Sequence, residues 1–167
     1  LIRPLSEALP HGTRGKNYLF NISLDAAARY IDSISHFNGP QKRKLYSGAT
    51  RTKMNGSFAR GEALFRQIAA NSGTDDPIEN LLYLDTKTYL PSDILTKVDR
   101  MSMAASLETR SPLLDQDLIE YVARIPSELK LKGSETKYIF KRAVEGFVPR
   151  EILYRQKQGF GVPIGDW

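Results

Sequence analysis

The sequence predicts a mainly helical fold, and three observations support this. In most segments the apolar residues recur every three or four positions, the spacing that gives an α-helix one buried face. No pair of segments shows the alternation of apolar and polar residues that half-buried strands require. Glycine and proline, such as Gly73 and Pro126, interrupt the periodic segments at helical intervals. We therefore expect short helices joined by turns.

The first half of the chain divides into irregular and periodic stretches. Residues 1–21 are rich in proline, glycine and basic side chains and are expected to form an irregular connector, and residues 48–58 a mobile loop. Ser23 is the expected N-cap of the first long helix, which ends at Asn38-Gly39-Pro40. Further helices are expected over residues 40–47, 59–70 and 77–90.

The second half continues the helical pattern. Asp115 is the expected cap of a helix that ends at Pro126. Its predicted buried residues are Leu118, Ile119, Val122 and Ile125. A brief extended segment over residues 129–131 precedes a turn at Gly133. Helices are then expected over residues 134–147, with Phe147 on the inner face, and 149–153.

The stretch from Leu90 to Asp115 has the densest mixture of apolar and charged residues. Pro91 and Ser92 resemble the start of a helix, where Asp93 would face the positive end of the helix dipole. The expected core face of this helix consists of Ile94, Leu95, Val98, Met101 and Ala105. Lys97 and Arg100 follow Asp93 at spacings of four and three, so the three charges share another face.

Four more charges lie close to this expected core. Asp99 projects at the edge of the apolar face, beside Leu95 and Met103, where a partly desolvated carboxylate needs a partner. Glu108, Arg110 and Asp115 follow the helix. Such a group of charges forms either a buried ion-pair network or the wall of a polar site. The plainer interpretation makes Glu108 and Arg110 structural ion-pair partners and Asp115 a helix cap.

Composition excludes several classes of site. The chain has no cysteine, which rules out disulfides and thiolate nucleophiles within it. Its two histidines lack a metal-ligand spacing, so we predict no metal site formed by this segment. No run of about 18 apolar residues predicts a membrane span. Leu1–Pro10 has no features of a leader peptide, and we expect the sequence to be part of a longer chain.

Two clusters permit more than one interpretation. The net charge is +5, and the basic residues gather at Lys42-Arg43-Lys44. This cluster is a solvated face, an attractor of an anionic substrate or, least favoured, a nucleic-acid contact. Ser72-Gly73-Thr74-Asp75-Asp76 resembles a phosphate-binding loop, but a helix precedes it instead of a strand, so we expect a helix–helix turn.

The tail contains the most suggestive single residue. Lys157 lies in an irregular segment with Gly159 and Gly161, and glycine lets the backbone approach a ligand closely. A lysine placed in this way can stabilise negative charge on a phosphate or carbonyl oxygen. The alternative is a solvated surface lysine.

Three ordered blocks carry a family resemblance. They are Lys97-Val-Asp-Arg-Met-Ser-Met-Ala, Leu107-Glu-Thr-Arg-Ser-Pro-Leu-Leu-Asp115 and Arg155-Gln-Lys-Gln-Gly-Phe-Gly-Val-Pro163. They closely resemble the C-terminal synthetase domain of glutamine-hydrolysing asparagine synthetases. The resemblance is clear over residues 84–167 and rests on position alone over residues 1–83. Leu114 stands where the family commonly has phenylalanine, a conservative change.

The resemblance implies a fold and a reaction. The family forms asparagine from aspartate, ATP and glutamine-derived ammonia, through a β-aspartyl-adenylate and with Mg²⁺. Its synthetase domain is an α/β fold of the ATP-pyrophosphatase type (adenine nucleotide α-hydrolase-like) whose C-terminal part is largely helical. Residues 1–167 would then form a C-terminal helical fragment of that domain, with the parallel sheet largely missing.

The resemblance also implies roles for individual residues. Lys157 matches the family lysine beside the pyrophosphate and the reacting carboxyl, with Gly159, Gly161 and Arg100 in the same vicinity. Asp93 matches the active-site acid that would hold magnesium, ammonia or the substrate amino group. The register makes Asp99 a near alternative to Asp93. The supporting ion pairs would be those of Glu108, Arg110 and Asp115.

Several parts of the family pattern are absent from the 167 residues. The cysteine nucleophile and the Ser-Gly-Gly-x-Asp-Ser loop for ATP phosphates do not occur. We therefore expect ATP and Mg²⁺ to be bound mainly elsewhere in a parent protein, and this fragment alone to be inactive. We further expect a cytoplasmic protein with small-molecule substrates, no nucleic-acid or membrane partner, and homo-oligomers as one option, because apolar helix faces would lie exposed.

Two other functions remain open at this stage. A related amidotransferase would use the same chemistry on another carboxylate, such as a peptide or a sugar acid. A non-catalytic helical interaction module would keep the helical scaffold and lack the catalytic chemistry. The presence of Lys157 argues against this option, because a scaffold does not require a lysine there.

Overall fold

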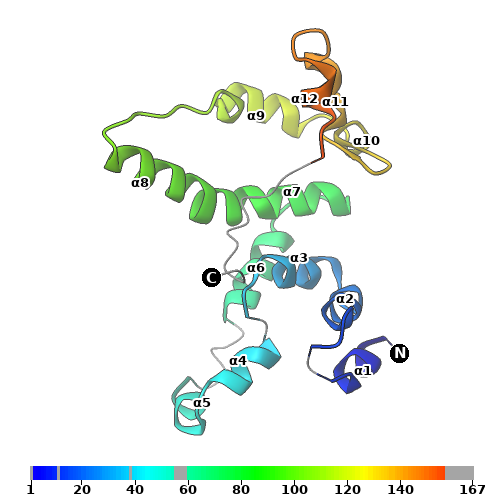
Figure 1. The fold of residues 1–167 in the computed structure, drawn as a ribbon, viewed down its shortest axis with the longest axis vertical. Helices are drawn as coiled ribbons and strands as arrows, with labels where there is room; N and C mark the ends of the chain where they lie inside the picture. The colour runs from blue at the N-terminus through cyan, green and yellow to red at the C-terminus, as the bar shows by residue number, and fades with distance from the viewer. Residues whose placement is uncertain (1, 11, 38, 55–59, 157–167) are drawn as a thin grey trace. The chain divides into compact units, whose positions relative to one another are not determined.

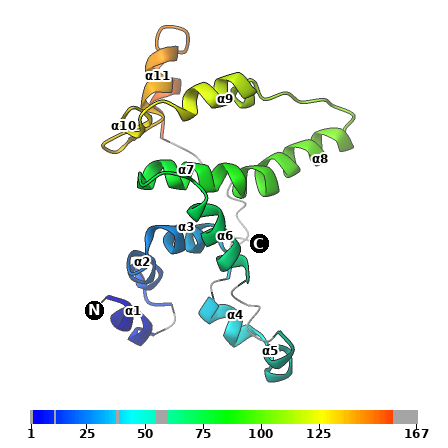
Figure 2. The ribbon, with the colours of Figure 1, turned by 180° about the vertical axis from the view of Figure 1, so that it is seen from behind.

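The computed structural model describes residues 2–10, 12–37, 39–54 and 60–156. The chain forms two compact units, Leu1–Arg110 and Ser111–Trp167. Both units are mainly helical, as predicted, and the strands within the described ranges form a single two-stranded hairpin (Figures 1 and 2). None of the described helices has the length and apolar content that crossing a membrane requires.

The helices of the first unit follow one another with short connections. They are α1 (Ile2–Ala8), α2 (Lys16–Ile22), α3 (Ala26–Ile34), α4 (Gly39–Leu45), α5 (Gly48–Met54), α6 (Arg60–Ala70), α7 (Pro77–Lys87), the π-helical turn η2 (Leu90–Leu95) and α8 (Thr96–Ala104). The predicted helices over residues 40–47, 59–70 and 77–90 are confirmed in type, with shifted ends.

Two segments predicted to be irregular are helical. Residues 1–21 contain α1 and most of α2. Pro4 is compatible with α1 because it lies in the first turn, where proline is tolerated. Within residues 48–58 the described part forms α5, where the backbone N–H of Thr50 donates to Ser47 Oγ at 3.2 Å. Residues 55–58 lie outside the described residues.

The first long helix also begins later than predicted. Its N-cap is Asp25, whose carboxylate accepts a hydrogen bond from the Ala28 N–H at 2.9 Å. Ser23 instead follows the last turn of α2 and donates its hydroxyl to the Phe20 carbonyl. Asp25 also forms an ion pair with Arg66 of α6 at 3.0 Å, which ties the start of α3 to α6.

The core of the first unit lies where α3, α6 and α7 pack together. Leu84 of α7 is fully buried, and Ile31 and Ala69 complete the set of buried apolar residues in the described part of the chain. A polar contact crosses the same interface, because the Tyr30 hydroxyl donates to Asp85 Oδ1 at 2.7 Å. The turn between α6 and α7 is also bonded, since Asn80 Nδ2 donates to the Ala69 carbonyl at 3.1 Å. The helix–helix turn predicted at residues 72–76 is therefore confirmed.

Residues 77–104 form one helical rod that is interrupted at Thr88 and changes type in the middle (Figures 1 and 2). The predicted helix start at Ser92 is wrong, since the Ser92 N–H donates to the Thr88 carbonyl within the rod. Pro91 has no N–H and its ring crowds the carbonyl four residues before it, which disfavours a regular α-turn. The chain passes this proline through the wider π-helical turn η2.

The second unit contains short elements. They are a 3₁₀ turn (Pro112–Leu114), α9 (Gln116–Ala123), α10 (Ser127–Lys130), β1 (Leu131–Lys132), β2 (Glu135–Thr136), α11 (Tyr138–Val144) and α12 (Arg150–Leu153). The strands pair antiparallel, with Leu131 opposite Thr136. The turn at Gly133 and the last helical turn were predicted, but of the extended segment predicted over residues 129–131 only Leu131 is in a strand, because residues 127–130 form α10. α11 begins after the hairpin instead of at residue 134.

The burial predicted for the second unit is wrong in part. Leu118, Ile119 and Val122 of α9 are exposed, and Phe147 is 88% exposed in the turn after α11. The helical periodicity of these residues is real, but within this unit no described segment covers their apolar face.

Candidate functional site

Asp93 lies in the π-helical turn η2, and its carboxylate is paired. Lys97 Nζ lies 2.8 Å from Asp93 Oδ2, one turn further along the rod, so the two charges share a face, as their spacing predicts, and form an ion pair. The hydrogen bond from Lys97 lowers the pKa of Asp93, with smaller contributions from the Tyr89 hydroxyl and from His36. Asp93 in turn raises the pKa of Lys97. The pair is therefore a fixed carboxylate beside a fixed ammonium, both reachable by solvent.

The environment of Asp99 and Arg100 differs from the prediction. Both are exposed on α8, which has no buried residue. Asp99 was expected to be partly desolvated beside Leu95 and Met103, but Met103 itself is exposed, because within the first unit no described segment covers this face. Neither side chain forms a hydrogen bond or ion pair with another described residue.

Glu108, Arg110 and Asp115, the three residues expected to support the site, contact residues close to them in the sequence. Arg110 Nε donates to Glu108 Oε1 at 2.8 Å, and both side chains are mostly exposed, so the predicted ion pair exists but is not buried. Asp115 Oδ1 accepts from the Leu118 N–H at 3.1 Å and caps α9, as expected. The structure thus gives these three residues ordinary structural contacts.

Lys157, Gly159 and Gly161 lie outside the described residues. The described chain ends at Gln156, two residues after Tyr154, which follows α12 directly. Tyr154 is the last residue before Lys157 to which the structure assigns specific contacts.

Those contacts form a cluster that sequence reasoning missed. We call it the Tyr154 cluster, and its members are Glu135, Lys141, Arg142, Glu145, Arg150 and Tyr154. The Tyr154 hydroxyl donates to Glu145 Oε1 at 3.3 Å. Lys141 Nζ lies 5.2 Å and the Arg150 guanidinium 5.0 Å from the centre of its ring, within the range of cation–π attraction.

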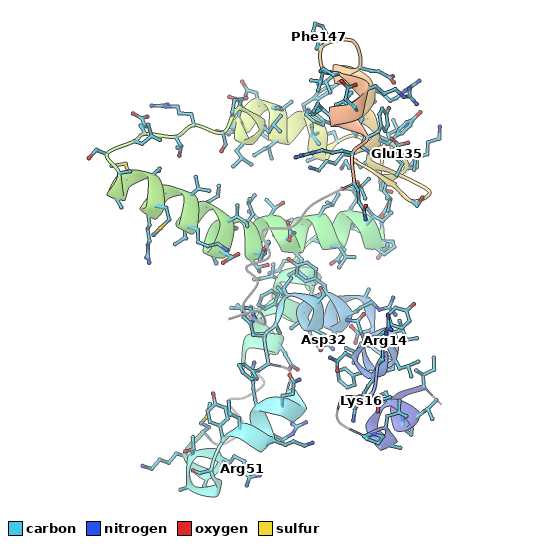
Figure 3. All side chains as sticks on the ribbon, in the orientation of Figure 1. Arg14, Lys16, Asp32, Arg51, Glu135 and Phe147 are labelled. Atoms are coloured by element: carbon cyan, nitrogen blue, oxygen red, sulfur yellow. The ribbon has the colours of Figure 1, made fainter. Side chains whose placement is uncertain are left out.

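The carboxylates bind the same cations. Glu145 pairs with Arg142 at 2.7 Å and Arg150 at 3.8 Å, and Glu135 of β2 pairs with Lys141 at 3.4 Å. Figure 3 labels Glu135 at the hairpin and Phe147 in the turn after α11. A hydrogen bond to Tyr154 and the nearby Glu145 carboxylate raise the pKa of Arg142. The spacings 142–145 and 150–154 were the available sequence signal, although only tertiary structure brings them together.

The basic cluster has a simple structural setting. Lys42, Arg43 and Lys44 lie in the last turn of α4, and Arg51, labelled in Figure 3, and Lys53 lie in that of α5. Cations at helix C-termini interact favourably with the helix dipole. This setting favours a solvated basic face.

The described residues do not form a site that fits a magnesium ion. They contain no group of three or more acidic, histidine or cysteine side chains close enough to bind a metal. Asp93 is the one candidate ligand from the sequence analysis with a defined charged neighbour, and that neighbour is a cation. Mg²⁺ prefers several oxygen ligands, so this carboxylate alone is a poor site for it.

Comparison with known proteins identifies the family. The family model described as asparagine synthase matches residues 7–167. Asparagine synthetase [glutamine-hydrolyzing] 1 of Bacillus subtilis is 35% identical over 163 residues, which cover 98% of this chain and 25% of that protein. Asparagine synthetase [glutamine-hydrolyzing] 3 of the same organism is 42% identical over 93 residues, or 56% of this chain and 15% of that protein.

A relative with a different name also matches. The amidase chyE of Penicillium rubens is 36% identical over 98 residues, or 54% of this chain and 15% of that protein. The chain spans about a quarter of the length of the curated relatives that match 98% of it. No solved structure is significantly similar to it. The match over residues 7–167 shows that the chain belongs to the asparagine synthase family.

Proposed function

We propose that this chain is the helical C-terminal part of the synthetase domain of a glutamine-hydrolysing asparagine synthetase. The observation that carries the proposal is the match to named asparagine synthetases along 98% of the chain. The mainly helical fold agrees with it. The parent enzyme would be a cytoplasmic carbon–nitrogen ligase acting on aspartate, ATP and glutamine or ammonia.

In the proposed reaction the side-chain carboxylate of aspartate attacks the α-phosphorus of ATP and pyrophosphate leaves. Ammonia then attacks the acyl carbon, and AMP leaves as asparagine forms. Negative charge grows on the phosphate oxygens in the first step and on the carbonyl oxygen in the second. Lys157 would stabilise that charge as a positioned ammonium.

Asp93 would act on the nitrogen side of the reaction. Its lowered pKa keeps it ionised at neutral pH, so it can accept a hydrogen bond from ammonia or from the substrate amino group. Lys97 pairs with its Oδ2 atom. Asp99 is the alternative acid, with Arg100 beside it, and the Glu108–Arg110 pair and the Asp115 cap would support the connection after α8.

The 167 residues alone are proposed to be inactive. They contain no cysteine to hydrolyse glutamine, and their described part has no acidic cluster for Mg²⁺. ATP and Mg²⁺ would be bound mainly by other parts of the parent protein. Homo-oligomers are part of the proposal because large apolar side chains of α8 and α9 are exposed, whereas nucleic acid and membranes are not proposed as partners.

The test compares full-length wild type with Lys157→Ala. We expect the wild type to release pyrophosphate and form asparagine from aspartate, ATP, Mg²⁺ and ammonia, and the variant to lose about 100-fold or more in kcat, the size of effect typical of one lost charge-stabilising donor. Lys53→Ala, at an exposed lysine of α5, is the matched control and should behave as wild type. Wild-type activity in Lys157→Ala would contradict the role of Lys157.

A second candidate is an amidotransferase that acts on another carboxylate. This option is kept because one relative, similar over 54% of the chain, is named an amidase instead of an asparagine synthetase. Product analysis separates the two, since ATP-dependent pyrophosphate release without asparagine would point to another acceptor. A parent protein that consumes no ATP would leave the non-catalytic helical module as the remaining interpretation.

A further inference from the structure

The turn between α11 and α12 surrounds an open pocket of about 430 Å³, lined by residues 145–150 of the second unit. Backbone hydrogen bonds fix this turn, because the N–H groups of Phe147 and Val148 both donate to the Val144 carbonyl, at 3.0 and 3.2 Å. Gly146 reverses the chain with a φ of +99°, which glycine adopts without strain. The pocket is therefore built by bonded backbone and does not depend on a ligand for its shape.

Most of the pocket lining is apolar. Phe147, Val148 and Pro149 follow one another along one side of it. Phe147 is 88% exposed, more than any other large apolar side chain in the described part of the chain, and Figure 3 labels it at the turn. An aromatic ring left in water gains free energy when an apolar group covers it. The lining therefore favours a ligand with an apolar body.

Arg150 brings a positive charge to the rim of the pocket. Its side chain is 81% exposed, and the nearest carboxylate oxygen, Glu145 Oε1, lies 3.8 Å away, which is too far for a hydrogen bond. The guanidinium lies 5.0 Å from the centre of the Tyr154 ring, and among the described residues it donates no hydrogen bond. Its position is thus restrained from two sides while its N–H donors remain available. A guanidinium with free donors is the group best suited to bind a carboxylate through two parallel hydrogen bonds.

The charges around the pocket favour an anion over a cation. Glu145 is the only acid of the lining, and its Oε2 atom pairs with Arg142 at 2.7 Å, so its charge is offset from outside the pocket. Arg150 then leaves the rim with a net positive charge. The volume falls within the range of about 300–1,000 Å³ that is usual for small-molecule sites. Size and charge together fit a small organic anion.

We propose that the pocket of residues 145–150 binds a small carboxylate with an apolar body. The carboxylate pairs with the guanidinium of Arg150, and the apolar body packs on Phe147 and its two neighbours. The site belongs wholly to the second unit and requires neither ATP nor the acids of the rod. This inference therefore stands apart from the proposed synthetase reaction and is tested by binding alone.

The experiment measures binding of 3-phenylpropanoate to the full-length protein by saturation-transfer NMR titration. Two further ligands separate the parts of the proposed recognition. The amide 3-phenylpropanamide keeps the ring and lacks the negative charge, and acetate keeps the charge and lacks the apolar body. The protein variants are Arg150→Gln, Phe147→Ala and, as matched control, Arg124→Gln, at an exposed arginine that follows α9. Thermal unfolding of each variant is recorded alongside.

We expect the wild type to bind 3-phenylpropanoate with a Kd on the order of 1 mM, as befits a ligand of this size in an open pocket. Arg150→Gln should weaken binding about 10-fold, the usual loss for a hydrogen bond to a charged group. Phe147→Ala should weaken it about 3- to 10-fold. Arg124→Gln should bind as wild type does, and all unfolding midpoints should stay close together because the replaced side chains are exposed.

Four results would overturn the inference. Absence of binding by the wild type is the first, and equal binding of the amide and the carboxylate is the second. Acetate bound as tightly as 3-phenylpropanoate would show simple attraction of an anion to a basic surface. Unchanged binding in both Arg150→Gln and Phe147→Ala would place the ligand elsewhere on the protein. If Arg150→Gln fails to fold, the comparison of the three ligands on wild type and Phe147→Ala still decides the question.

Discussion

α7 and α8 are two halves of one helical rod, yet only α7 is packed. α7 buries Leu84 completely against its neighbours α3 and α6, whereas Val98, Met101 and Met103 of α8 are 43%, 69% and 59% exposed. Both helices have an apolar face in the sequence. The difference shows that helical periodicity predicts which residues share a face, but not whether a partner for that face lies in the same stretch of chain.

The largest expected effect tests this difference directly. Leu84→Ala should destabilise the 167-residue chain by about 2–5 kcal/mol, because a fully buried leucine leaves a cavity. Met101→Ala in α8 should change stability by less than about 0.5 kcal/mol, as is usual for exposed positions. Urea unfolding followed by helical circular dichroism measures both. Equal costs for the two substitutions would mean that α8 is packed in solution, as self-association would produce.

Should Leu84→Ala fail to fold, Leu84→Val gives a milder version of the same test. It removes a single methylene and leaves a smaller cavity, so its cost should fall between those of Leu84→Ala and Met101→Ala. Sedimentation of the wild-type chain at several concentrations checks whether exposed apolar faces lead to association.

A middle-sized effect is expected at the polar contact within the packed half. Burial, and then the hydrogen bond to Asp85, raise the pKa of Tyr30 well above its usual value, with an opposing contribution from Thr88. The folded state therefore favours the neutral phenol. The stabilisation is fully present below the unfolded pKa of about 10 and is lost as pH rises toward the folded pKa.

Tyr30→Phe checks this contact. It should cost about 1 kcal/mol near neutral pH, the typical value of one hydrogen bond. Above pH 10 the wild type should lose stability more steeply than the variant, so that the difference between them narrows. Parallel unfolding curves for the two proteins between pH 8 and pH 11 would show that Tyr30 does not make this contact in solution.

The sequence predicted the elements that have strong local signals. Asp115 accepts a hydrogen bond from the N–H of Leu118, three residues later, so the start of α9 follows from the capping rule. Pro149 lies at the start of α12, so that helix start follows from the preference of proline for the first helical turn. α1, α2 and α5 were missed because short helices have weak periodicity and their composition resembles that of loops. The π-helical turn was missed because Pro91 usually marks a helix start, whereas here it lies inside the rod, in η2.

Within the candidate site, only contacts between residues close together in the sequence could be predicted. The Asp93–Lys97 pair follows from a spacing of four on one helix. The desolvation expected for Asp99 required knowledge of which segment covers α8, and no local pattern contains that information. The Tyr154 cluster brings together residues from 135 to 154 through a hairpin and two short helices, which no pairwise spacing specifies.

The smallest expected effect on stability concerns Asp93 and separates it from Asp99. The lowered pKa of Asp93 means that its pairing with Lys97 stabilises the fold above the unfolded pKa of 3.8, and that this contribution is lost as pH falls through the lower folded pKa. Asp93→Asn should therefore cause a slight loss of stability at pH 7 that disappears at low pH and in about 1 M salt, which screens exposed pairs.

Asp99→Asn is the matched control for this loss. Asp99 has no partner among the described residues, and α8 continues from η2, so no free helix N-terminus faces it. Its replacement should leave both the stability at pH 7 and its salt dependence unchanged. In the full-length enzyme Asp93→Asn should lower kcat for asparagine formation, and Asp99→Asn should not. If instead Asp99→Asn lowered kcat and Asp93→Asn did not, the catalytic acid would be Asp99 of α8 and not Asp93 of the π-helical turn. The exposed half of the rod would then contribute the acidic residue of the active site.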